Sequence, residues 1–508
     1  MKAAASRARG PGILRARSRA LANRSARTVF ATLAAACLAL VLSGCRQADV
    51  ALQVGAGFTA RVLCSLVFNS GMDPDRAFDD YVAPKLGPAY RLASFEIDYD
   101  ARSVVGYGLN HEALAIHRDG VGCTLVADAN EAELRAAILP ARAEGETAPG
   151  PDEGAWPRGN AGPARLANAL AAEEIEAAIL EAFDEPNPGG PLRLTTAVAV
   201  AHRGQLIAER YAPGFVAETP LISWSMAKSV VATLIAIASH EGRFEIDGPA
   251  PVPEWQEPGD PRGEITVDEL LRMSSGLEFD EYYGAINDVS VMLFTRRDAG
   301  AFGAGKPLAH PRDEVWAYSS GTSNILARVL RMELGDDLAA LVRWSRSALF
   351  DRIGMRTAFF EPDASGSFIG SSFVFASARD WTRFGQLHLQ DGIWEGERIL
   401  PEGWVDYVRT PTPAADRGRY GAHWWLNAGT PARPEDRDWP SLPREVYAAR
   451  GMSGQYVVVV PSAELVVVRL GLAQAEGDAL HGIERLVKRI LDAVDSATPD
   501  VASEAAPD

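Results

Sequence analysis

The chain has 508 residues, of which 47% are hydrophobic and 23% charged, an ordinary globular composition with room for one large domain and a smaller one. This apolar content excludes disorder of the whole chain. The net charge of −17 argues against a nucleic-acid partner and against electrostatic binding to anionic lipid.

Residues 1–44 differ from the rest of the chain. They carry Lys2 and seven arginines but no acidic residue, and they include a short apolar run at 29–42. A basic segment, a short apolar run and a small-residue cleavage site are typical of a secretory signal peptide. A short transmembrane anchor is the alternative, although the run is too short to span a membrane comfortably.

The sequence "LSGC", residues 42–45, follows that apolar run directly. It resembles the lipobox of bacterial lipoproteins, in which the cysteine is lipidated and becomes the first residue of the mature chain. The resemblance implies acyl chains on Cys45 that attach the protein to the bacterial cell envelope, at the outer membrane or the periplasmic face. Arg46 gives no obvious signal for retention at the inner membrane.

Two of the four cysteines remain once Cys37 leaves with the signal peptide and Cys45 takes the lipid. In an oxidising compartment Cys64 and Cys123 can form a disulfide. Two buried free thiols are the alternative.

The segment 45–139 is expected to be a small mixed unit. Residues 58–68 are predicted to form a strand, residues 73–86 a helix, and residues 94–126 further strands with a turn at Asp119-Gly120. Residues 140–167 are rich in Pro, Gly and Ala, which indicates a linker or a long surface loop.

A domain large enough to hold an active site is predicted over 168–495. A disordered acidic tail is predicted at 496–508. A helix at 166–183 and a hairpin at 192–214 open the domain. Three antiparallel strands over 445–471 and a closing helix at 478–494 end it. The predicted fold class is therefore α/β (α+β): an antiparallel sheet built from both ends of the domain, flanked by helices, with a helical lobe from the middle.

The stretch "SWSMAKSVVATLIAIASHEGR", residues 223–243, contains one of only five lysines. It is predicted to be a buried helix with Ser225 at its first turn. Residues three apart share a helix face, so Lys228 can reach the Ser225 hydroxyl. A desolvated lysine loses proton affinity and can act as a base. The alternative is that Ser225 only caps the helix and Lys228 is exposed.

Two further motifs follow in order. "WAYSSG" puts Tyr318 before the start of another helix, and a tyrosine can relay protons if a cation lowers its pKa. "RGMSGQ" puts two glycines around Ser453 at the start of a strand, where a backbone N–H could complete an oxyanion hole. The alternatives are an interface aromatic for Tyr318 and a simple β-turn for Ser453.

Ser-x-x-Lys, a later tyrosine motif and a glycine-containing strand motif together resemble the serine β-lactamase and penicillin-binding-protein superfamily. The likeness is strongest to its class C-like branch of esterases and 6-aminohexanoate-dimer hydrolases. "TVDELLRMSSGLEFDE", "LFDRIGM" and "YGAHWWLN" also fit that branch. The resemblance covers roughly residues 190–475. It implies a β-lactamase-like fold with the active site between the sheet and the helical lobe.

The resemblance also implies roles for matching positions. Ser225 would be the acylating nucleophile, Lys228 the base and Tyr318 the proton relay. The oxyanion hole would be the N–H groups of Ser225 and Gln455, with Gly454 beside it.

Two positions depart from the family pattern. Ser320 stands where Tyr-x-Asn has its amide, and Met452 stands where Lys-Thr-Gly has its cation. A thioether cannot hold a substrate carboxylate. Arg450 could replace that cation if no bulge intervenes on the strand. An uncharged ester or amide therefore fits the sequence better than a β-lactam.

An apolar, aromatic pocket could also come from nearby residues: Trp224, Tyr282, Tyr283, Trp425 and Met452. Core packing is the alternative for each of them, and a solvated loop is a further alternative for the two tyrosines. No metal or cofactor is predicted, because "HEALAIH", residues 111–117, fits a strand better than a metal-binding helix.

The sequence thus predicts a lipid-anchored serine hydrolase that cleaves a small-molecule ester or amide through acyl-Ser225 and has no nucleic-acid partner. One alternative is a β-lactamase or D,D-peptidase that acts on peptidoglycan. The other is a non-catalytic binding lipoprotein that kept the fold.

Overall fold

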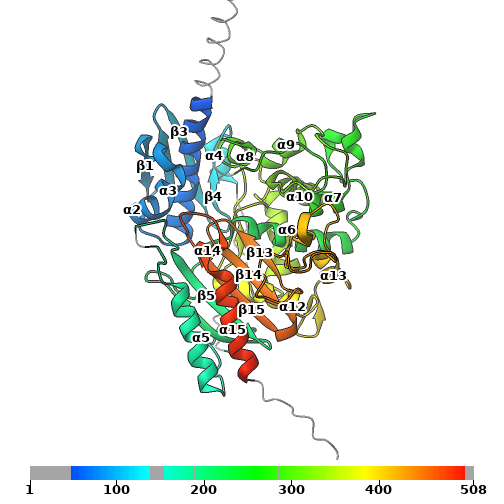
Figure 1. Cartoon of the computed structure of the whole chain (residues 1–508). Coiled ribbons are helices and arrows are strands. Elements are labelled where there is room, and N and C mark those ends of the chain that lie inside the picture. Colours follow the sequence, from blue (N-terminus) through cyan, green and yellow to red (C-terminus); the bar gives the residue numbers. More distant parts are fainter. Residues whose placement is uncertain (1–46, 138–153, 188, 283–285, 498–508) are drawn as a thin grey trace, which may run out of the picture. The chain divides into compact units, whose positions relative to one another are not determined.

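The computed structural model describes residues 47–137, 154–187, 189–282 and 286–497 (Figure 1). The predicted signal peptide, the lipid site at Cys45 and most of the predicted acidic tail lie outside these residues. The chain from Gln53 onward forms one compact unit. The domain boundaries within it remain predictions.

A six-stranded antiparallel sheet lies at the centre of this unit. Its order joins strands from both ends of the predicted domain, as the sequence indicated: β12 (Trp425–Leu426), β13 (Tyr447–Gly451), β14 (Gln455–Val460), β15 (Leu465–Gly471), β5 (Thr195–His202) and β6 (Gln205–Tyr211). Valine runs in β14 and β15 pair in register, for example Val457 with Val468. Strands this rich in buried β-branched residues need cover on both faces.

Helices cover both faces of this sheet. α5 (Ala169–Ala182) and α15 (Ile483–Ala497) lie side by side over one face, after the short α14 (Asp478–His481) (Figure 1). α12 (Ala378–Leu389) packs on the other face. A Cβ at Gly385 of α12 would lie only 2.6 Å from a Val466 methyl group, so a glycine is needed for this close approach.

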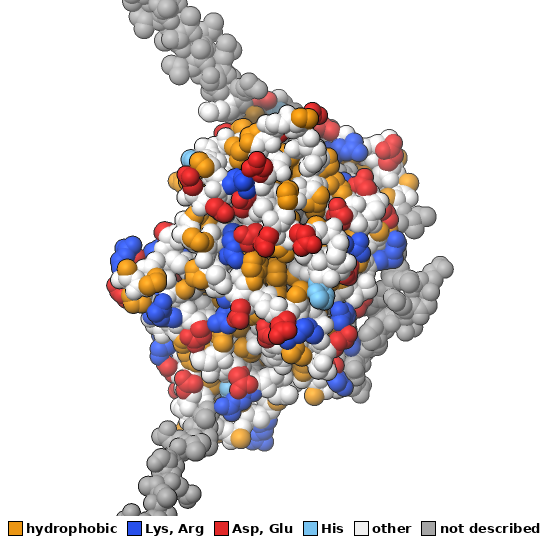
Figure 2. Space-filling model, turned by 90° about the vertical axis from the view of Figure 1, so that its right-hand side faces the viewer, with side chains coloured by type: hydrophobic (Ala, Val, Ile, Leu, Met, Phe, Trp, Pro, Cys, Tyr) orange, Lys and Arg blue, Asp and Glu red, His pale blue; other side chains and the backbone are white. Residues whose placement is uncertain are grey.

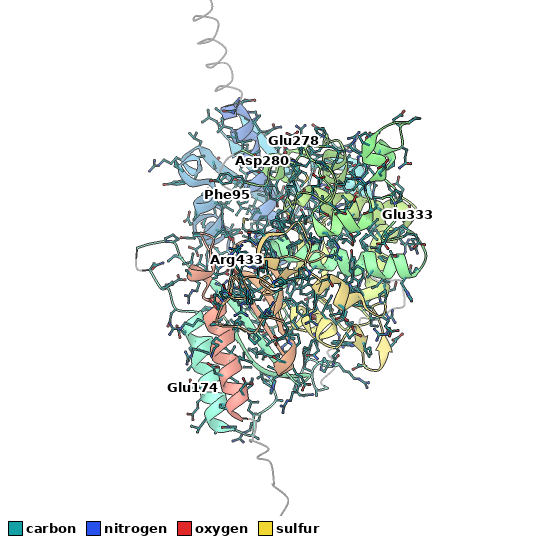
Figure 3. The ribbon with its side chains drawn as sticks, turned by 45° about the vertical axis from the view of Figure 1, so that its right-hand side comes forward. Phe95, Glu174, Glu278, Asp280, Glu333 and Arg433 are labelled. Carbon is teal, nitrogen blue, oxygen red and sulfur yellow. A yellow bond between two sulfur atoms is a disulfide. The ribbon has the colours of Figure 1, made fainter. Side chains whose placement is uncertain are left out.

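The middle of the chain forms the predicted helical lobe around α6 (Ala227–His240), which is buried along nearly all its length. The other helices of this part are α7 (Val267–Arg272), α8 (Asp288–Thr295), α9 (Ala299–Ala304), α10 (Ser320–Glu333), α11 (Leu338–Ser345) and α13 (Trp404–Arg409). Small strands accompany them: β7 (Leu221–Ile222), β8 (Phe359–Phe360), β9 (Val374–Ala376), β10 (Ile393–Trp394) and β11 (Glu397–Arg398). In Figure 3, Glu174 labels α5, which covers the central sheet, and Glu333 labels α10 in the helical lobe.

The N-terminal unit begins with a helix, Gln47–Asn69, so the prediction of a strand at 58–68 is wrong. The run is buried on nearly all sides, and such a run has no hydrophobic periodicity to distinguish helix from strand. By length and composition this helix could cross a membrane, with a mean hydropathy of 1.6. However, 67% of its apolar window is buried inside the protein, as in a core helix.

The helix and the strands predicted for the rest of the N-terminal unit are present. Asp73 caps a helical segment over 74–86, made of α2 (Pro74–Ala77), a π-helical turn at Phe78–Val82 and α3 (Ala83–Leu86). A four-stranded antiparallel sheet follows, β1 (Ala93–Asp98), β2 (Ser103–Gly108), β3 (His111–Arg118) and β4 (Gly122–Leu125), and then α4 (Glu131–Ala136). A disulfide joins Cys64 of the first helix to Cys123 of β4, with 6.1 Å between their Cα atoms.

The described half of the predicted linker is packed rather than loose. Trp156 is buried, and Arg383 of α12 donates hydrogen bonds to the carbonyl oxygens of Pro157 and Gly159. The surface carries both charges. On the face shown in Figure 2, acidic and basic side chains are interspersed with apolar ones, and no large basic area is visible there.

Candidate active site

Ser225 lies where the chain turns from β7 into α6. A 3-10 turn, Trp224–Met226, precedes the helix, and Trp224 has a φ of 44°. A bulky residue in this left-handed region is strained and persists only where its surroundings hold it. The turn places Ser225 at the wall of a cavity of about 580 Å³.

Lys228 is buried one helical turn after Ser225, with 1% of its surface exposed. Its ammonium donates to Ser225 Oγ at 3.0 Å, to Ser320 Oγ at 3.1 Å and to the carbonyl oxygen of Ser371 at 3.1 Å. Burial lowers the pKa of Lys228 to about 8, and the nearby Glu281 carboxylate opposes this shift. The reading of Lys228 as an exposed surface residue is therefore excluded.

The contacts of Lys228 are those that a general base beside Ser225 would need. The charged ammonium uses all three N–H groups on its three acceptors. The neutral amine keeps two N–H groups for Ser320 and Ser371, and its lone pair can then accept the Ser225 proton. A pKa of about 8 leaves a useful fraction of neutral amine at neutral pH.

Tyr318 lies over the same lysine, with its ring centroid 4.8 Å from Lys228 Nζ. Burial raises the pKa of Tyr318, and Glu281 raises it further, while a hydrogen bond with Ser225 and the charge of Arg450 act in the opposite direction. The Arg450 cation does lower the pKa of Tyr318, but burial outweighs this charge, so the net shift is upward. Tyr318 is therefore a protonated phenol at neutral pH, suited to donate a proton.

An aromatic cluster holds Tyr318 in place. Its ring centroid lies 5.3 Å from that of Trp425, 5.9 Å from that of Tyr420 and 6.4 Å from that of Trp316. Trp425 also lines the cavity, as predicted, together with Met452.

Gln455, predicted to supply an oxyanion-hole N–H, does not line the cavity, and the role of its N–H stays a prediction. Gln455 is buried and pairs with Gly451 across the β13–β14 hairpin, and its side-chain amide donates to backbone carbonyl groups. Gly454 is also turned away, and its carbonyl oxygen accepts from Arg469. The three-residue loop between the paired strands directs both residues inward.

Gly451 and Met452 line the cavity beside Ser225 in their place. The approach of the two segments is close, because a Cβ on Gly451 would clash with the carbonyl oxygen of Ser223 and lie 3.1 Å from Ser225 N. Gly451 and Met452, rather than Gln455, therefore form the cavity wall beside Ser225.

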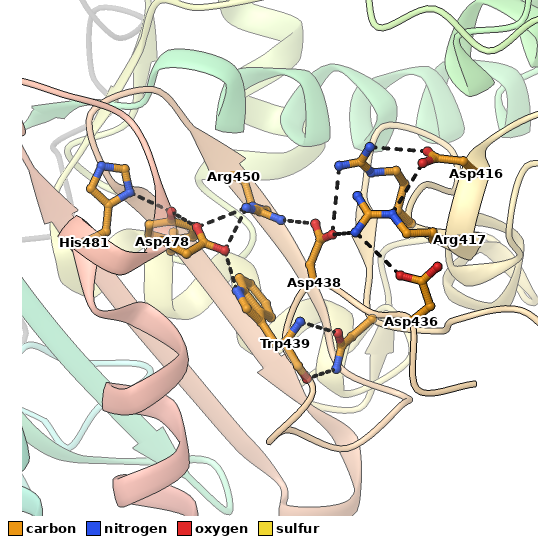
Figure 4. A network of polar contacts seen from close by, with 11 residues as sticks. Asp416, Arg417, Asp436, Asp438, Trp439, Arg450, Asp478 and His481 are labelled. Carbon is orange, nitrogen blue, oxygen red and sulfur yellow. Dashed lines mark hydrogen bonds and ion pairs between the residues drawn. The ribbon is translucent and has the colours of Figure 1, made fainter. Parts of the chain in front are cut away.

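Arg450 lines the cavity but does not present a free charge (Figure 4). Its guanidinium donates to Asp438 at 2.8 Å and to Asp478 at 3.1 Å. It also lies 5.1 Å from the Trp425 ring and 5.0 Å from the Trp439 ring. With two carboxylates on one guanidinium, Arg450 does not replace the missing family cation.

The other predicted substrate-binding residues lie elsewhere. Trp224 is buried beneath the site and does not line the cavity, while Ser320 is buried between Lys228 and Glu281. Tyr282 is 75% exposed to solvent, and Tyr283 lies outside the described residues.

Glu281 is the functional residue that the motifs did not reveal. It accepts from the Ser320 N–H at 2.5 Å and from Ser320 Oγ at 2.6 Å. Its charge raises the pKa of both Lys228 and Tyr318. Nothing in the sequence "LEFDE" marks Glu281 as a site residue, so only the fold shows that it lies beside Ser320.

The described residues contain no group of three His, Cys, Asp or Glu side chains that could hold a metal ion. His111 and His117 lie on strand β3, as predicted.

A family model of beta-lactamases matches residues 187–484, more than half of the chain. The chain belongs to the beta-lactamase family. It is a β-lactamase-like serine hydrolase, which confirms the predicted fold and enzyme class. The match begins after the N-terminal unit.

The 6-aminohexanoate-dimer hydrolase of Paenarthrobacter ureafaciens is 25% identical over 329 residues, which cover 59% of this chain and 79% of the relative. Two solved structures share the fold, each with a TM-score of 0.50. One, from Bacillus anthracis and described as a 6-aminohexanoate-dimer hydrolase, is 22% identical and covers 60% of this chain and 80% of its own. The other, from Bacteroides dorei DSM 17855 and described as a beta-lactamase, is 16% identical and covers 65% of this chain and 99% of its own.

Proposed function

We propose that this protein hydrolyses an uncharged ester or amide through an acyl-Ser225 intermediate. The observation that carries the proposal is the 3.0 Å hydrogen bond between Lys228 Nζ and Ser225 Oγ at the wall of the cavity. A buried lysine with a lowered pKa beside a hydroxyl is an activated nucleophile pair.

In acylation, neutral Lys228 takes the Ser225 proton while Oγ attacks the substrate carbonyl carbon. The N–H groups of Ser225 and Met452 receive the developing oxyanion. Collapse of the tetrahedral intermediate breaks the bond to the leaving group, which takes the phenol proton of Tyr318. The Lys228 ammonium then returns its proton to Tyr318, so the serine proton is accounted for on the leaving group.

In deacylation, water attacks the acyl carbon and gives its proton to Lys228. The bond to Ser225 Oγ breaks, and Oγ recovers a proton from Lys228. The acid product leaves with the water oxygen, and the enzyme returns to its starting protonation state.

The cavity wall supports an uncharged acyl group. Met452 offers a thioether where the family pattern has a cation, and Arg450 is already paired with Asp438 and Asp478. A substrate carboxylate would have to displace one of these aspartates. This disfavours β-lactams and peptidoglycan stems, and the relative described as a 6-aminohexanoate-dimer hydrolase supports an amide.

An uncharged fluorophosphonate probe followed by intact-mass measurement tests the proposal. We expect one adduct on the wild type, none on Ser225→Ala, and a normal adduct on the control Ser229→Ala, whose hydroxyl bonds the His423 carbonyl oxygen away from the cavity. An adduct that survives Ser225→Ala would sink the proposal. A stable penicillin adduct on Ser225 would favour the peptidoglycan alternative instead.

We also propose that Cys45 carries the lipid that attaches the enzyme to the cell envelope. The "LSGC" sequence after an apolar run supports this. Cells that express the full chain with an alkyne fatty acid should yield labelled wild type and Cys37→Ser but unlabelled Cys45→Ser. Equal labelling of the Cys45 variant would refute the proposal.

A further inference from the structure

The N-terminal unit reaches the active site through Tyr81. This residue lies in the π-helical turn Phe78–Val82, more than 100 residues before the family match begins, and it is fully buried. Its hydroxyl accepts a hydrogen bond from Trp224 Nε1 at 2.7 Å and lies 3.0 Å from Ser453 Oγ. One side chain of the N-terminal unit thus joins two of the three sequence motifs.

Both partners of Tyr81 have strained backbones next to reacting groups. Trp224, with φ of 44°, precedes the nucleophile Ser225. Ser453, with φ of 63°, follows Met452 at the cavity wall. Non-glycine residues in this region are strained and need the surrounding structure to fix them.

Tyr81 bridges its two partners through one hydroxyl group. Trp224 Nε1 can only donate, so the Tyr81 oxygen accepts there, while either hydroxyl of the Tyr81–Ser453 pair can donate to the other. Burial raises the pKa of Tyr81, so its hydroxyl stays protonated. The bridge is therefore made by neutral groups that do not titrate near neutral pH.

A second contact reaches the same loop. Lys85 Nζ donates to Glu476 at 2.8 Å, and Glu476, which lines the cavity, accepts from the Ser453 N–H at 3.0 Å. Gln474 also donates to the carbonyl oxygen of Asp80 at 3.0 Å. The helical segment around Tyr81 therefore reaches Ser453 in two ways: directly at its hydroxyl, and through Lys85 and Glu476 at its backbone N–H.

The N-terminal unit is firmly attached to the catalytic part by a separate buried cluster. Glu361 is fully buried and accepts from Asn69 and from the Cys123 N–H, both at 2.7 Å, and from Ser65 at 2.9 Å. Breaking such a buried network is costly, so the unit cannot move away easily.

We propose that Tyr81 is a positioning residue of this hydrolase, through which the N-terminal unit holds Ser225 and the Met452 backbone in their reactive geometry. The inference rests on the proposed acyl-Ser225 function. Tyr81 does not line the cavity, so it acts on the geometry of the reacting groups and not on substrate contact.

Tyr81→Phe removes only the bridging hydroxyl. With a p-nitrophenyl ester as the substrate, we expect kcat to fall about 10- to 100-fold with KM little changed, because misplacement of the reacting groups acts on the chemical step. The pH midpoint of the rate should stay where it is in the wild type, because Tyr81 does not contact Lys228. A general loss of folded enzyme would instead lower the measured rate in proportion to the active-site titre.

A double-mutant cycle provides the sharper test. Trp224→Phe removes the same hydrogen bond from the other side, so Tyr81→Phe combined with Trp224→Phe should be no slower than the slower single variant. Tyr407→Phe is the matched control, because it removes a partly buried hydroxyl that donates to Asp268 away from the cavity, and its kcat should be unchanged. Should Tyr81→Phe fail to fold, the fall in kcat of Trp224→Phe answers the same question.

Wild-type kcat in Tyr81→Phe, or losses that multiply in the double variant, would overturn the inference. Failure of the proposed function has a different signature, because the wild type itself would then show no turnover that depends on Ser225.

Discussion

Two cations line or adjoin the same cavity, and the protein stabilises them in opposite ways. Lys228 donates to three neutral oxygen atoms of the described residues, and burial lowers its pKa to about 8. Arg450 bonds Asp438 and Asp478 and stacks between tryptophan rings. The Arg450 guanidinium cannot lose its proton, so it needs carboxylates nearby. The Lys228 amine can lose its proton and become neutral.

The two cations therefore differ in role. Burial disfavours the charged form of Lys228, which makes its amine reactive. Two carboxylates stabilise the charge of Arg450, which therefore forms part of the cavity wall. The variants below are ordered by the size of the effect that this difference predicts.

Lys228→Met should have the largest effect, a loss of turnover of about 10³-fold or more, because the general base is gone. The same change should stabilise the fold. At pH 7 the lowered pKa corresponds to about 3 kcal/mol of destabilisation by the buried charge.

The stability advantage of Lys228→Met over the wild type should shrink as the pH rises. Lys228 has a folded pKa of about 8 and an ordinary value of 10.5, so the wild type gains stability as the pH rises between them. Calorimetry should therefore show the Met variant with the higher Tm at pH 7 and a smaller advantage at pH 10. A lower Tm than the wild type at pH 7 would contradict this account.

Arg450→Met should act mainly on stability. It leaves Asp438 and Asp478 without their shared partner, at a cost of about 2 kcal/mol or more after allowance for their partial exposure. Urea unfolding should show this loss, whereas Arg450→Lys, which keeps the charge, should lose less. Turnover that falls as far as in Lys228→Met, with the fold intact, would show that Arg450 takes part in the chemistry.

Glu281→Gln should have the smallest effect. The carboxylate raises the pKa of Lys228, so its removal should move the midpoint of the pH–rate profile to lower pH. Glu278→Gln, on the exposed segment labelled in Figure 3, is the matched control for the lost charge and should leave the midpoint in place. A midpoint that moves to higher pH in Glu281→Gln would refute the electrostatic role.

The sequence predicted what depends on local pattern. The buried helix after Ser225 and the hairpins at both ends of the sheet follow from periodicity and turn residues. The strand predicted at 58–68 failed because a segment buried on all sides has no period to read.

The site was predicted in part, and the errors have physical causes. Gln455 was expected beside the substrate, but the hairpin pairs it with Gly451 and buries its side chain, so it does not line the cavity. Trp224 was expected in the substrate pocket, but Tyr81, 143 residues earlier, draws its indole away from the cavity. Contacts of this sequence separation leave no local signal.

The most direct test of the account is the rate at which Ser225 reacts with an uncharged fluorophosphonate between pH 6 and pH 9.5. If neutral Lys228 is the base, the rate should rise about tenfold per pH unit below its pKa and level off through a midpoint near pH 8. The same profile should appear in Glu278→Gln and be absent in Lys228→Met. A rate that is flat across this range, or that still rises steeply at pH 9.5, would contradict the assignment of Lys228 as the base.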